Sequence, residues 1–526
     1  MKKRSKTIIL ISILFSLFLL MGYSINKTGK INYLFKGFNS LKTIAFFAIF
    51  FIIFYKLLVW LYEFFDKKEK KSKNSKIYEF IFEKRPILIP FLIFLIVGIP
   101  ILIIYYPGPV HWDGLKQIGY FYNIFPWSNH HPVFPTILMG ISMKIGRFLI
   151  NDNFGVFLFT FPQYIFSAFT FSYMLFFLRE LKAPKYLIVT TFIFFLICPI
   201  WYINAYTLVK DTYYYLIFIF FFIFYIKLYY DQSKKNKIWL IIFSLLLMLF
   251  RNNGIYVVLL SFIIAAIFNK NARKVLLKFC LIVVLFQTCY NVTLKLCGIS
   301  QGNNREMLSV PIQQTARYVT KYELTTDEKE FIESVFHMDI GTIQRKYDAE
   351  LSDPIKFSFN AKGSTLKEYF VLWFKMFLKH PKVYVDAFLE NYYGYFYPPK
   401  KEYKDGLAQF EMVYNTKVNT GYFDFYYIKS LKPARSFVKG AINEIRDLKV
   451  IDLLFNVGTY TWVLIILMGY ALYKKRYDKI VLAMPLIITL AFCFVSPVNA
   501  YVRYMYPIIV GWPIYMALVF KKGKIK

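Results

Sequence analysis

The chain has 526 residues, of which 57% are hydrophobic and 21% aromatic, and its formal net charge is +34. Apolar runs long enough to cross a hydrocarbon core of about 30 Å recur along the sequence, which excludes a soluble multidomain protein. The basic residues collect in short segments between these runs and no nucleic-acid-binding motif accompanies them, so the sequence also argues against a nucleic-acid partner.

About twelve apolar runs follow one another and predict an all-α polytopic membrane protein. The first run follows a basic start and lacks a small-residue cleavage site, so we expect it to remain as a signal anchor. The apolar segment 133–149 contains Lys144 and Arg147, and we expect it to lie along the outer surface with these side chains at the lipid headgroups. The expected spans are 7–23, 43–64, 86–106, 156–178, 186–206, 213–230, 238–250, 255–268, 275–295, 456–474, 479–497 and 502–520.

The positions of the basic clusters predict the orientation of the chain. Because lysine and arginine in short loops favour the cytoplasmic side, both termini are predicted to be cytoplasmic. On that side the basic patches would meet anionic lipid headgroups. The segments predicted to lie outside the cytoplasm are 107–155, 207–212, 251–254, 296–455 and 498–502.

Changes in composition predict the domain organisation. Roughly two-thirds of all acidic residues fall in one segment, which has the size and helix signals of a compact, mainly α-helical extracytoplasmic domain. The predicted parts are a two-helix membrane addition (1–65), a basic cytoplasmic loop (66–85), a transmembrane core with the catalytic outer loop 107–155 (86–295), the extracytoplasmic domain (296–455), and C-terminal helices with a basic tail (456–526).

The outer loop 107–155 contains the first candidate functional residues. Asp113 is the single acid between the third expected span and segment 133–149. A single carboxylate at a membrane face is unfavourable unless it pairs with a cation or serves a function, which makes Asp113 a catalytic candidate. His130 and His131 are candidates for positioning substrate or shaping the loop, although solvated polar side chains are the simpler interpretation.

Polar insertions also interrupt three other outer helix ends, at Lys210-Asp211, Arg251-Asn252 and Arg503-Tyr504. Any single cation among them could be a snorkelling anchor. Their predicted position on the same side as Asp113 instead indicates a site for an anionic substrate, and arginine suits phosphate because its planar fork makes paired hydrogen bonds.

Gln313, Gln314 and Arg317 lie within about one helical turn of each other in REMLSVPIQQTARYV and are further substrate-binding candidates. An ordinary amphipathic helix explains the same spacing. The histidines of the outer loop match no standard zinc signature, so no metal ligand is predicted, whereas a divalent cation such as Mg²⁺ or Mn²⁺ on Asp113 and a substrate phosphate remains open. No Gly-rich phosphate loop or GxSxG motif occurs, which argues against nucleotide-driven transport and serine hydrolysis.

The order of these motifs resembles the GT-C class of membrane glycosyltransferases. Asp113 followed by HHPVFPTILMG is similar to the first outer loop of that class, and VKDTYY, RNNG and the terminal RYMYP fit the same pattern. SVPIQQTARY, YDAELSDPIK and HPKVYVDAFLENYYGYFYP resemble, more narrowly, a bacterial branch of it. The resemblance implies a GT-C-like helix bundle in a bacterial cell membrane.

The resemblance also implies an activity. It implies transfer of a sugar from a polyprenyl-phosphate donor to an envelope glycan, lipid or protein acceptor at the outer face. Asp113 would act as general base in an inverting reaction, while Lys210, Arg251 and Arg503 would hold the donor phosphate. Many GT-C proteins have paired acids in the first loop, whereas Asp113 is alone here, so Asp211 stays open as the alternative base.

Two other functions remain as alternatives. A polysaccharide polymerase or ligase would also use a polyprenyl-linked donor but would depend less on Asp113. A transporter of lipid-linked oligosaccharides should show inverted repeats and ionisable residues near the bilayer midplane, and the sequence shows neither.

Overall fold

The structure is a computed structural model that describes residues 2–67, 75–302, 304–402 and 422–521. Every regular element in these ranges is a helix, and extended segments meet only in isolated β-bridges. The predicted all-α fold is therefore confirmed for the described residues. The basic loop 66–85 and the basic tail lie partly outside them.

Six described helices are long and apolar enough to cross a membrane, or eight spans result if each of two bent helix pairs counts as one. The chain is thus an all-α membrane protein. The six are α1 (Lys2–Thr28), α2 (Phe38–Asp66), α7 (Asp152–Glu180), α10 (Lys210–Tyr230), α13 (Arg273–Leu296) and α25 (Val502–Phe520). The bent pairs are α3 (Lys76–Glu79) and η2 (Phe80–Lys84) with α4 (Leu88–Ile104), and α8 (Lys185–Ile197) with α9 (Pro199–Tyr206).

This number is lower than the predicted twelve because several apolar segments form short or broken helices. A 17-residue helix is only about 26 Å long, less than a typical hydrocarbon core. The expected span 186–206 bends by 58° at Pro199, since proline starts a new helix readily but cannot continue one. The short helices are α11 (Lys234–Phe250), α12 (Gly254–Phe268), α22 (Val457–Tyr473), α23 (Tyr477–Leu482) and α24 (Met484–Cys493).

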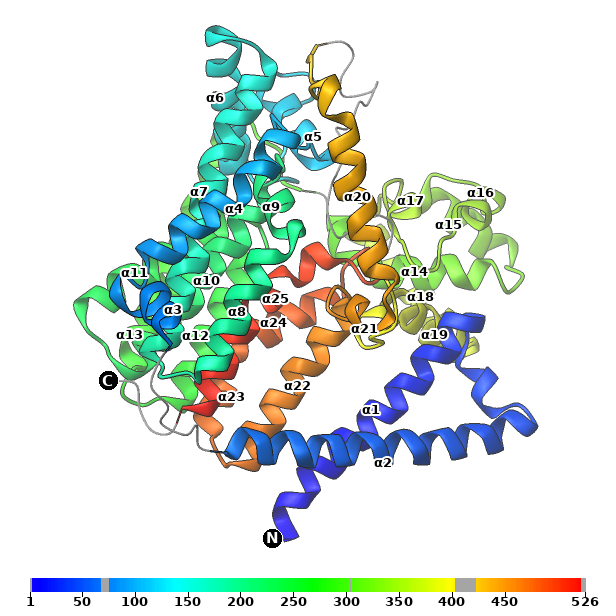
Figure 1. The fold of residues 1–526 in the computed structure, drawn as a ribbon. Coiled ribbons are helices and arrows are strands. Elements are labelled where there is room, and N and C mark those ends of the chain that lie inside the picture. Colours follow the sequence, from blue (N-terminus) through cyan, green and yellow to red (C-terminus); the bar gives the residue numbers. More distant parts are fainter. Residues whose placement is uncertain (1, 68–74, 303, 403–421, 522–526) are drawn as a thin grey trace.

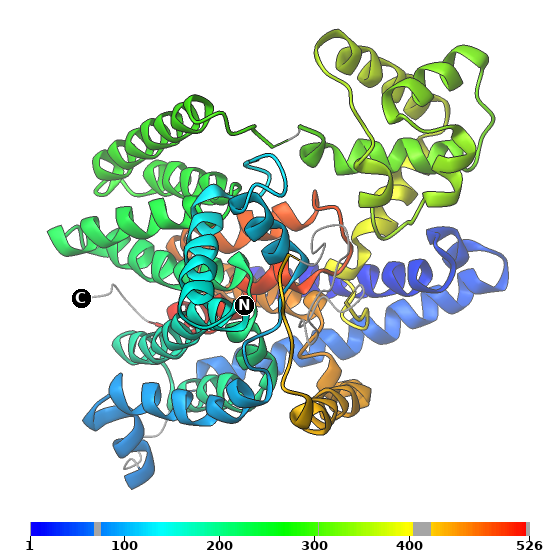
Figure 2. The same ribbon diagram turned by 90° about the horizontal axis from the view of Figure 1, so that it is seen from above.

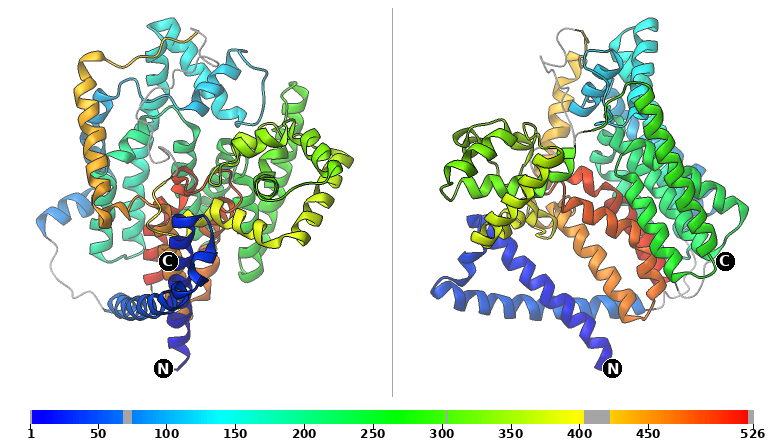
Figure 3. Two further views of the ribbon diagram at one scale, coloured as in Figure 1. Left: turned by 90° about the vertical axis from the view of Figure 1, so that its right-hand side faces the viewer. Right: turned by 180° about the vertical axis from the view of Figure 1, so that it is seen from behind.

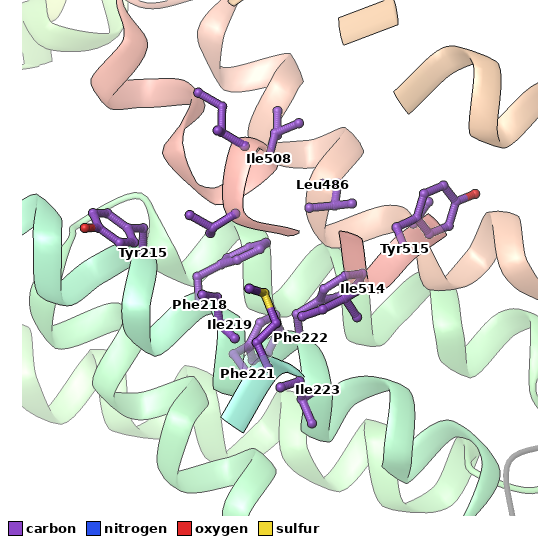
Figure 4. Packing of buried hydrophobic residues seen from close by; sticks show 14 of the residues in the cluster. Tyr215, Phe218, Ile219, Phe221, Phe222, Ile223, Leu486, Ile508, Ile514 and Tyr515 are labelled. Carbon is purple, nitrogen blue, oxygen red and sulfur yellow. The ribbon is translucent and has the colours of Figure 1, made fainter. Parts of the chain in front are cut away.

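Helix α10 is the centre of the bundle. Its sequence is aromatic or aliphatic on every side, and a helix of this kind is stable only where other helices surround it. Phe218 and Phe222 lie among buried side chains that include Ile508 and Ile514 of α25 (Figure 4). Because α10 is held on all sides, the position of its first residue, Lys210, is fixed by the core.

Two shorter helices, α5 (Trp112–Phe121) and α6 (Val133–Leu149), pack together at one end of the bundle, where α6 also packs on α7 (Figure 1). Helix α6 has the bounds expected for the interfacial segment, whereas α5 was not predicted. The headgroup contact expected for Arg147 is wrong. Arg147 pairs with Asp152, donates to the carbonyl of Tyr422 and lies against the ring of Phe423.

A separate helical domain lies to one side of the bundle (Figure 2) and has its own buried core. Its helices include a capping box at Thr325 and a break at His380-Pro381, where α18 ends and α19 begins. The domain contains η3 (Asn304–Leu308), α14 (Ser309–Val319), α15 (Thr326–Phe336), α16 (Ile340–Lys346), α17 (Asp353–Lys356), α18 (Gly363–Lys379) and α19 (Pro381–Tyr392).

The chain between this domain and α22 contains the remaining elements. They are η4 (Tyr393–Tyr395), η5 (Lys429–Leu431), α20 (Lys432–Asp447) and α21 (Lys449–Asp452), and η1 (Ile31–Phe35) connects α1 with α2. The helical domain is joined to the loop before α25 by backbone hydrogen bonds. The amide of Ser352 donates to the carbonyl of Pro497 (2.9 Å), and that of Asn499 donates to the carbonyl of Glu350 (2.9 Å).

Candidate functional site

Asp113 lies in the first turn of α5, and the local sequence explains how it is held there. The Nδ1 atom of His111 accepts a hydrogen bond from the Asp113 amide at 3.2 Å and so caps the helix. A Cβ atom on Gly114 would lie 2.1 Å from the carbonyl oxygen of Leu208, so only glycine lets α5 approach this backbone. This close approach brings Asp113 next to the start of α10.

Two cations from different helices meet at Asp113. The Lys210 Nζ atom lies 3.2 Å from Asp113 Oδ2, and the Arg503 Nη1 atom, from the first turn of α25, lies 2.9 Å from the same oxygen. The second carboxylate, Asp211, lies 3.6 Å from Arg251 and 3.6 Å from Arg503. The structure thus brings together Asp113, Lys210, Asp211, Arg251 and Arg503, here called the charge cluster.

The charge cluster contains three cations and two carboxylates, so one positive charge is left over. The Nε atom of Arg503 is buried and has no hydrogen-bond partner among the described residues. A buried N–H group without an acceptor destabilises the fold unless a ligand or a water molecule accepts its hydrogen bond. The arrangement therefore favours an anion.

The two carboxylates differ in accessibility. The Asp211 side chain is 4% exposed, whereas that of Asp113 is 21% exposed. Each lies in the first turn of a helix, where the helix dipole favours a negative charge. Asp113 is consequently the carboxylate that an incoming molecule can reach.

The surroundings set the protonation states near Asp113. Burial disfavours the carboxylate, but the Arg503 and Lys210 charges outweigh this effect and hold the pKa of Asp113 well below its ordinary value. Burial, reinforced by Arg503, lowers the pKa of His111 to about 4. Burial and Lys210 likewise lower the pKa of His131 well below its usual range. At neutral pH the carboxylate is charged and both imidazoles are neutral.

His131 is joined to the charge cluster and His130 is not. The Nδ1 atom of His131 lies 3.2 Å from Lys210 Nζ, and a neutral imidazole in this position accepts the hydrogen bond. His130 lies instead 3.7 Å from Glu306 in η3, which pairs with Lys356 at 2.7 Å. His131 positions Lys210, while His130 faces the helical domain.

Aromatic rings enclose the two arginines. The Arg251 guanidinium lies 4.9 Å from the ring centroid of Tyr504 and 5.3 Å from that of Tyr214, and Arg503 lies 5.1 Å from that of Tyr501. Tyr504 was predicted as a site residue, whereas Tyr214, Tyr501 and His111 were not. The only sequence signal for Tyr501 and His111 is that each precedes a charged site residue by two positions.

Asn252 does not contact the charge cluster directly. Its side-chain amide donates to the carbonyl of Asn129 at 2.6 Å, which ties the turn between α11 and α12 to the loop that carries the histidines. This contact keeps the Arg251 turn beside that loop. Asn252 is thus a supporting residue of the site.

The other substrate-binding candidates, in α14, have their contacts elsewhere. Gln313 donates to the carbonyl of Asp348, and Gln314 donates to the carbonyl of Tyr384 at 3.2 Å. Arg317 pairs with Glu390 and donates to the carbonyl of Gly29 at 3.2 Å. Among the described residues, no contact joins these three side chains to the charge cluster. The simpler interpretation, an amphipathic helix that packs in its domain, explains them.

In the absence of substrate, the charge cluster favours an anion over a divalent cation. Both carboxylates are already paired with lysine or arginine, and the surplus charge is positive. In the described part of the chain, no group of three or more histidine, cysteine or acidic side chains is placed to hold a metal ion.

Comparison with known proteins identifies a family but no function. No curated protein and no solved structure matches the chain. A family described as "Family of unknown function (DUF6020)" matches residues 124–524, a region that contains Lys210, Asp211, Arg251 and Arg503 but not Asp113. Because the match covers well over half of the sequence, this chain belongs to the DUF6020 family.

Proposed function

We propose that this protein is an integral membrane glycosyltransferase that moves a sugar from a polyprenyl-phosphate donor to an envelope glycan, lipid or protein acceptor. The observation that carries the proposal is the charge cluster. It combines an accessible, ionised carboxylate with a surplus of cations at the ends of apolar helices. Transfer of a sugar from a lipid phosphate requires at least a general base for the acceptor and cations that stabilise the leaving phosphate.

The phosphate site is formed by Lys210, Arg251 and Arg503. Without substrate, Arg503 and Lys210 are both paired with Asp113. A donor phosphate competes for both cations and accepts a hydrogen bond from the buried Nε atom of Arg503. Binding of the donor thus releases Asp113 from two ion pairs and makes the carboxylate more basic.

A small apolar cavity near Arg503 marks the place where the first part of the donor's isoprenoid chain would pack. The cavity is lined by Trp201, Leu454, Tyr460, Val502 and Tyr506 among others. Val502 immediately precedes Arg503 on α25, so the cavity is adjacent to the phosphate site. A phosphate site and an apolar cavity on one helix are what a lipid phosphate requires.

In the proposed reaction Asp113 takes the proton of an acceptor hydroxyl. The acceptor oxygen forms a bond to the anomeric carbon while the bond from that carbon to the phosphate oxygen breaks. The polyprenyl phosphate leaves with the bonding electron pair, and its charge is stabilised by Arg251 and Arg503. Attack opposite the leaving group inverts the anomeric centre.

The proposal includes a topology. In this topology the short helices α11, α12 and α22, and α23 together with α24, also cross the bilayer, giving about twelve spans, with both termini in the cytoplasm. The charge cluster and the helical domain then lie on the outer face of a bacterial cell membrane. Nucleotide sugars are not expected there, so a lipid-linked donor suits this location.

A complementation experiment tests the role of Asp113. In a strain that lacks this protein, the wild type and the control Asp231→Asn, an exposed acid at the opposite end of α10, should restore the envelope glycan. Asp113→Asn should be produced in normal amount and restore none of it. Full restoration by Asp113→Asn would show that Asp113 is not the base.

A further inference from the structure

Helix α2 leaves most of its apolar surface uncovered. It packs on α1 and η1 through one face that includes Phe54, Leu58 and Tyr62, and only its C-terminal end reaches α22, where Tyr62 donates to the carbonyl of Ile466 at 2.9 Å. The rest of α2 runs away from the bundle (Figures 1 and 3).

The uncovered side of α2 has a regular pattern. One set of its exposed residues recurs at alternating intervals of four and three positions and lies opposite the face that contacts α1. This is the spacing with which helices pack against each other along a seam. We call the set the α2 stripe, and it consists of Lys42, Phe46, Ile49, Ile53, Lys56, Trp60 and Glu63.

Lys56 is the unusual member of the α2 stripe. It lies within the apolar part of α2, about 15 Å along the helix from Asp66. Among the described residues, Lys56 forms no ion pair. An ammonium group directed at lipid in the interior of a span is unfavourable, and such residues normally face a partner of opposite charge.

We propose that the α2 stripe is the docking surface for a transmembrane helix of a second protein, which carries an aspartate or glutamate facing Lys56. The surface lies outside residues 124–524, the region that matches the family. The proposal goes beyond the catalytic function and does not depend on it.

A second copy of this chain does not fit the surface. Two copies in one membrane have the same orientation, so their α2 helices would run parallel about a two-fold axis. Lys56 would then face Lys56, and Glu63 would face Glu63, in a medium that screens charge poorly. Charge complementarity therefore favours a different protein.

Photo-crosslinking of the full-length protein in its native membrane tests the proposal. A photoreactive phenylalanine is placed at Phe46 on the stripe or, as control, at Ile44, which is also exposed and at nearly the same depth but about 200° around the helix. The expected result is a protein adduct from position 46 and none from position 44. The adduct should map to a membrane-spanning segment that contains an acidic residue.

A charge exchange then tests the role of Lys56. Lys56→Glu should reduce the adduct at least tenfold, Lys56→Arg should preserve it, and a lysine in place of the partner's acid should restore it in the Lys56→Glu background. Adducts with lipid only, with a second copy of this chain, or with a segment that lacks an acid would overturn the proposal. So would an unchanged yield with Lys56→Glu.

Discussion

At the scale of single residues, the two carboxylates of the charge cluster have similar partners but different accessibility. Asp113 contacts Lys210 and Arg503 and remains accessible, whereas Asp211 is enclosed beneath Lys210, Arg251 and Arg503. In the proposed reaction, an enclosed carboxylate is poorly placed to receive a proton from an acceptor hydroxyl. We therefore expect Asp211 to hold the three cations in place.

The variants Asp113→Asn and Asp211→Asn should therefore fail for different reasons. Asp211→Asn leaves buried cations without their carboxylate, and removal of one partner from a buried ion pair costs about 3–5 kcal/mol. Thermal unfolding in detergent should show a lowered midpoint for both variants, with the larger decrease for Asp211→Asn, because Asp211 is 4% exposed and Asp113 is 21% exposed. If Asp211→Asn were stable but inactive and Asp113→Asn active, Asp211 would be the base.

The sequence predicted the members of the charge cluster because of a simple physical constraint. Charged residues at the ends of apolar helices cannot face lipid, so helices that bundle bring them together. The same reasoning could not place Gln313, Gln314 and Arg317. In an amphipathic helix, polar side chains pair with nearby backbone as readily as with a ligand, and only the fold of the domain distinguishes the two.

At the scale of helices, the site depends on how closely α5 approaches the start of α10. Helix α5 was not predicted, because its short sequence is dominated by aromatic and glycine residues that favour no single structure. Distant contacts explain the error at Arg147 as well. The segment that covers this side chain begins 275 residues later in the chain, at Tyr422, beyond the reach of local patterns.

Gly114→Ala should separate the helices without unfolding them. The added methyl group would overlap the carbonyl of Leu208, so α5 must shift and Asp113 must move away from Lys210. The expected result is a loss of glycan complementation at normal protein amount. Gly440→Ala is the matched control, since a Cβ atom at this position of α20 meets no neighbouring atom within 4 Å, and it should leave activity unchanged. Full activity of Gly114→Ala would contradict the proposed geometry.

At the scale of the whole molecule, the hydrophobic runs predicted where the apolar helices of the bundle lie, but not where each of these helices bends or ends. Apolar length is visible in the sequence, whereas a bend at Pro199 or a short α24 depends on neighbouring helices that cover the exposed backbone. The helical domain was predicted from its acidic composition. Its attachment to the loop before α25 was not predicted, because this attachment consists of backbone hydrogen bonds, which any side chains permit.

The proposed topology predicts opposite labelling of two surface positions. Single cysteines at Lys235 and Lys329, both exposed, are introduced into a variant in which the exposed Cys289 and Cys297 are replaced. A membrane-impermeant thiol reagent should label position 329 in intact cells and position 235 only after the membrane is opened. Labelling of both positions from outside would contradict the orientation.

The hydrogen bonds between Glu350–Ser352 and Pro497–Asn499 have a mechanical consequence. Arg503 lies only four residues after Asn499, so the helical domain and the proposed phosphate site share one short piece of backbone. A rotation of that domain would shift this backbone and with it the start of α25. We therefore expect removal of the helical domain to loosen the position of Arg503.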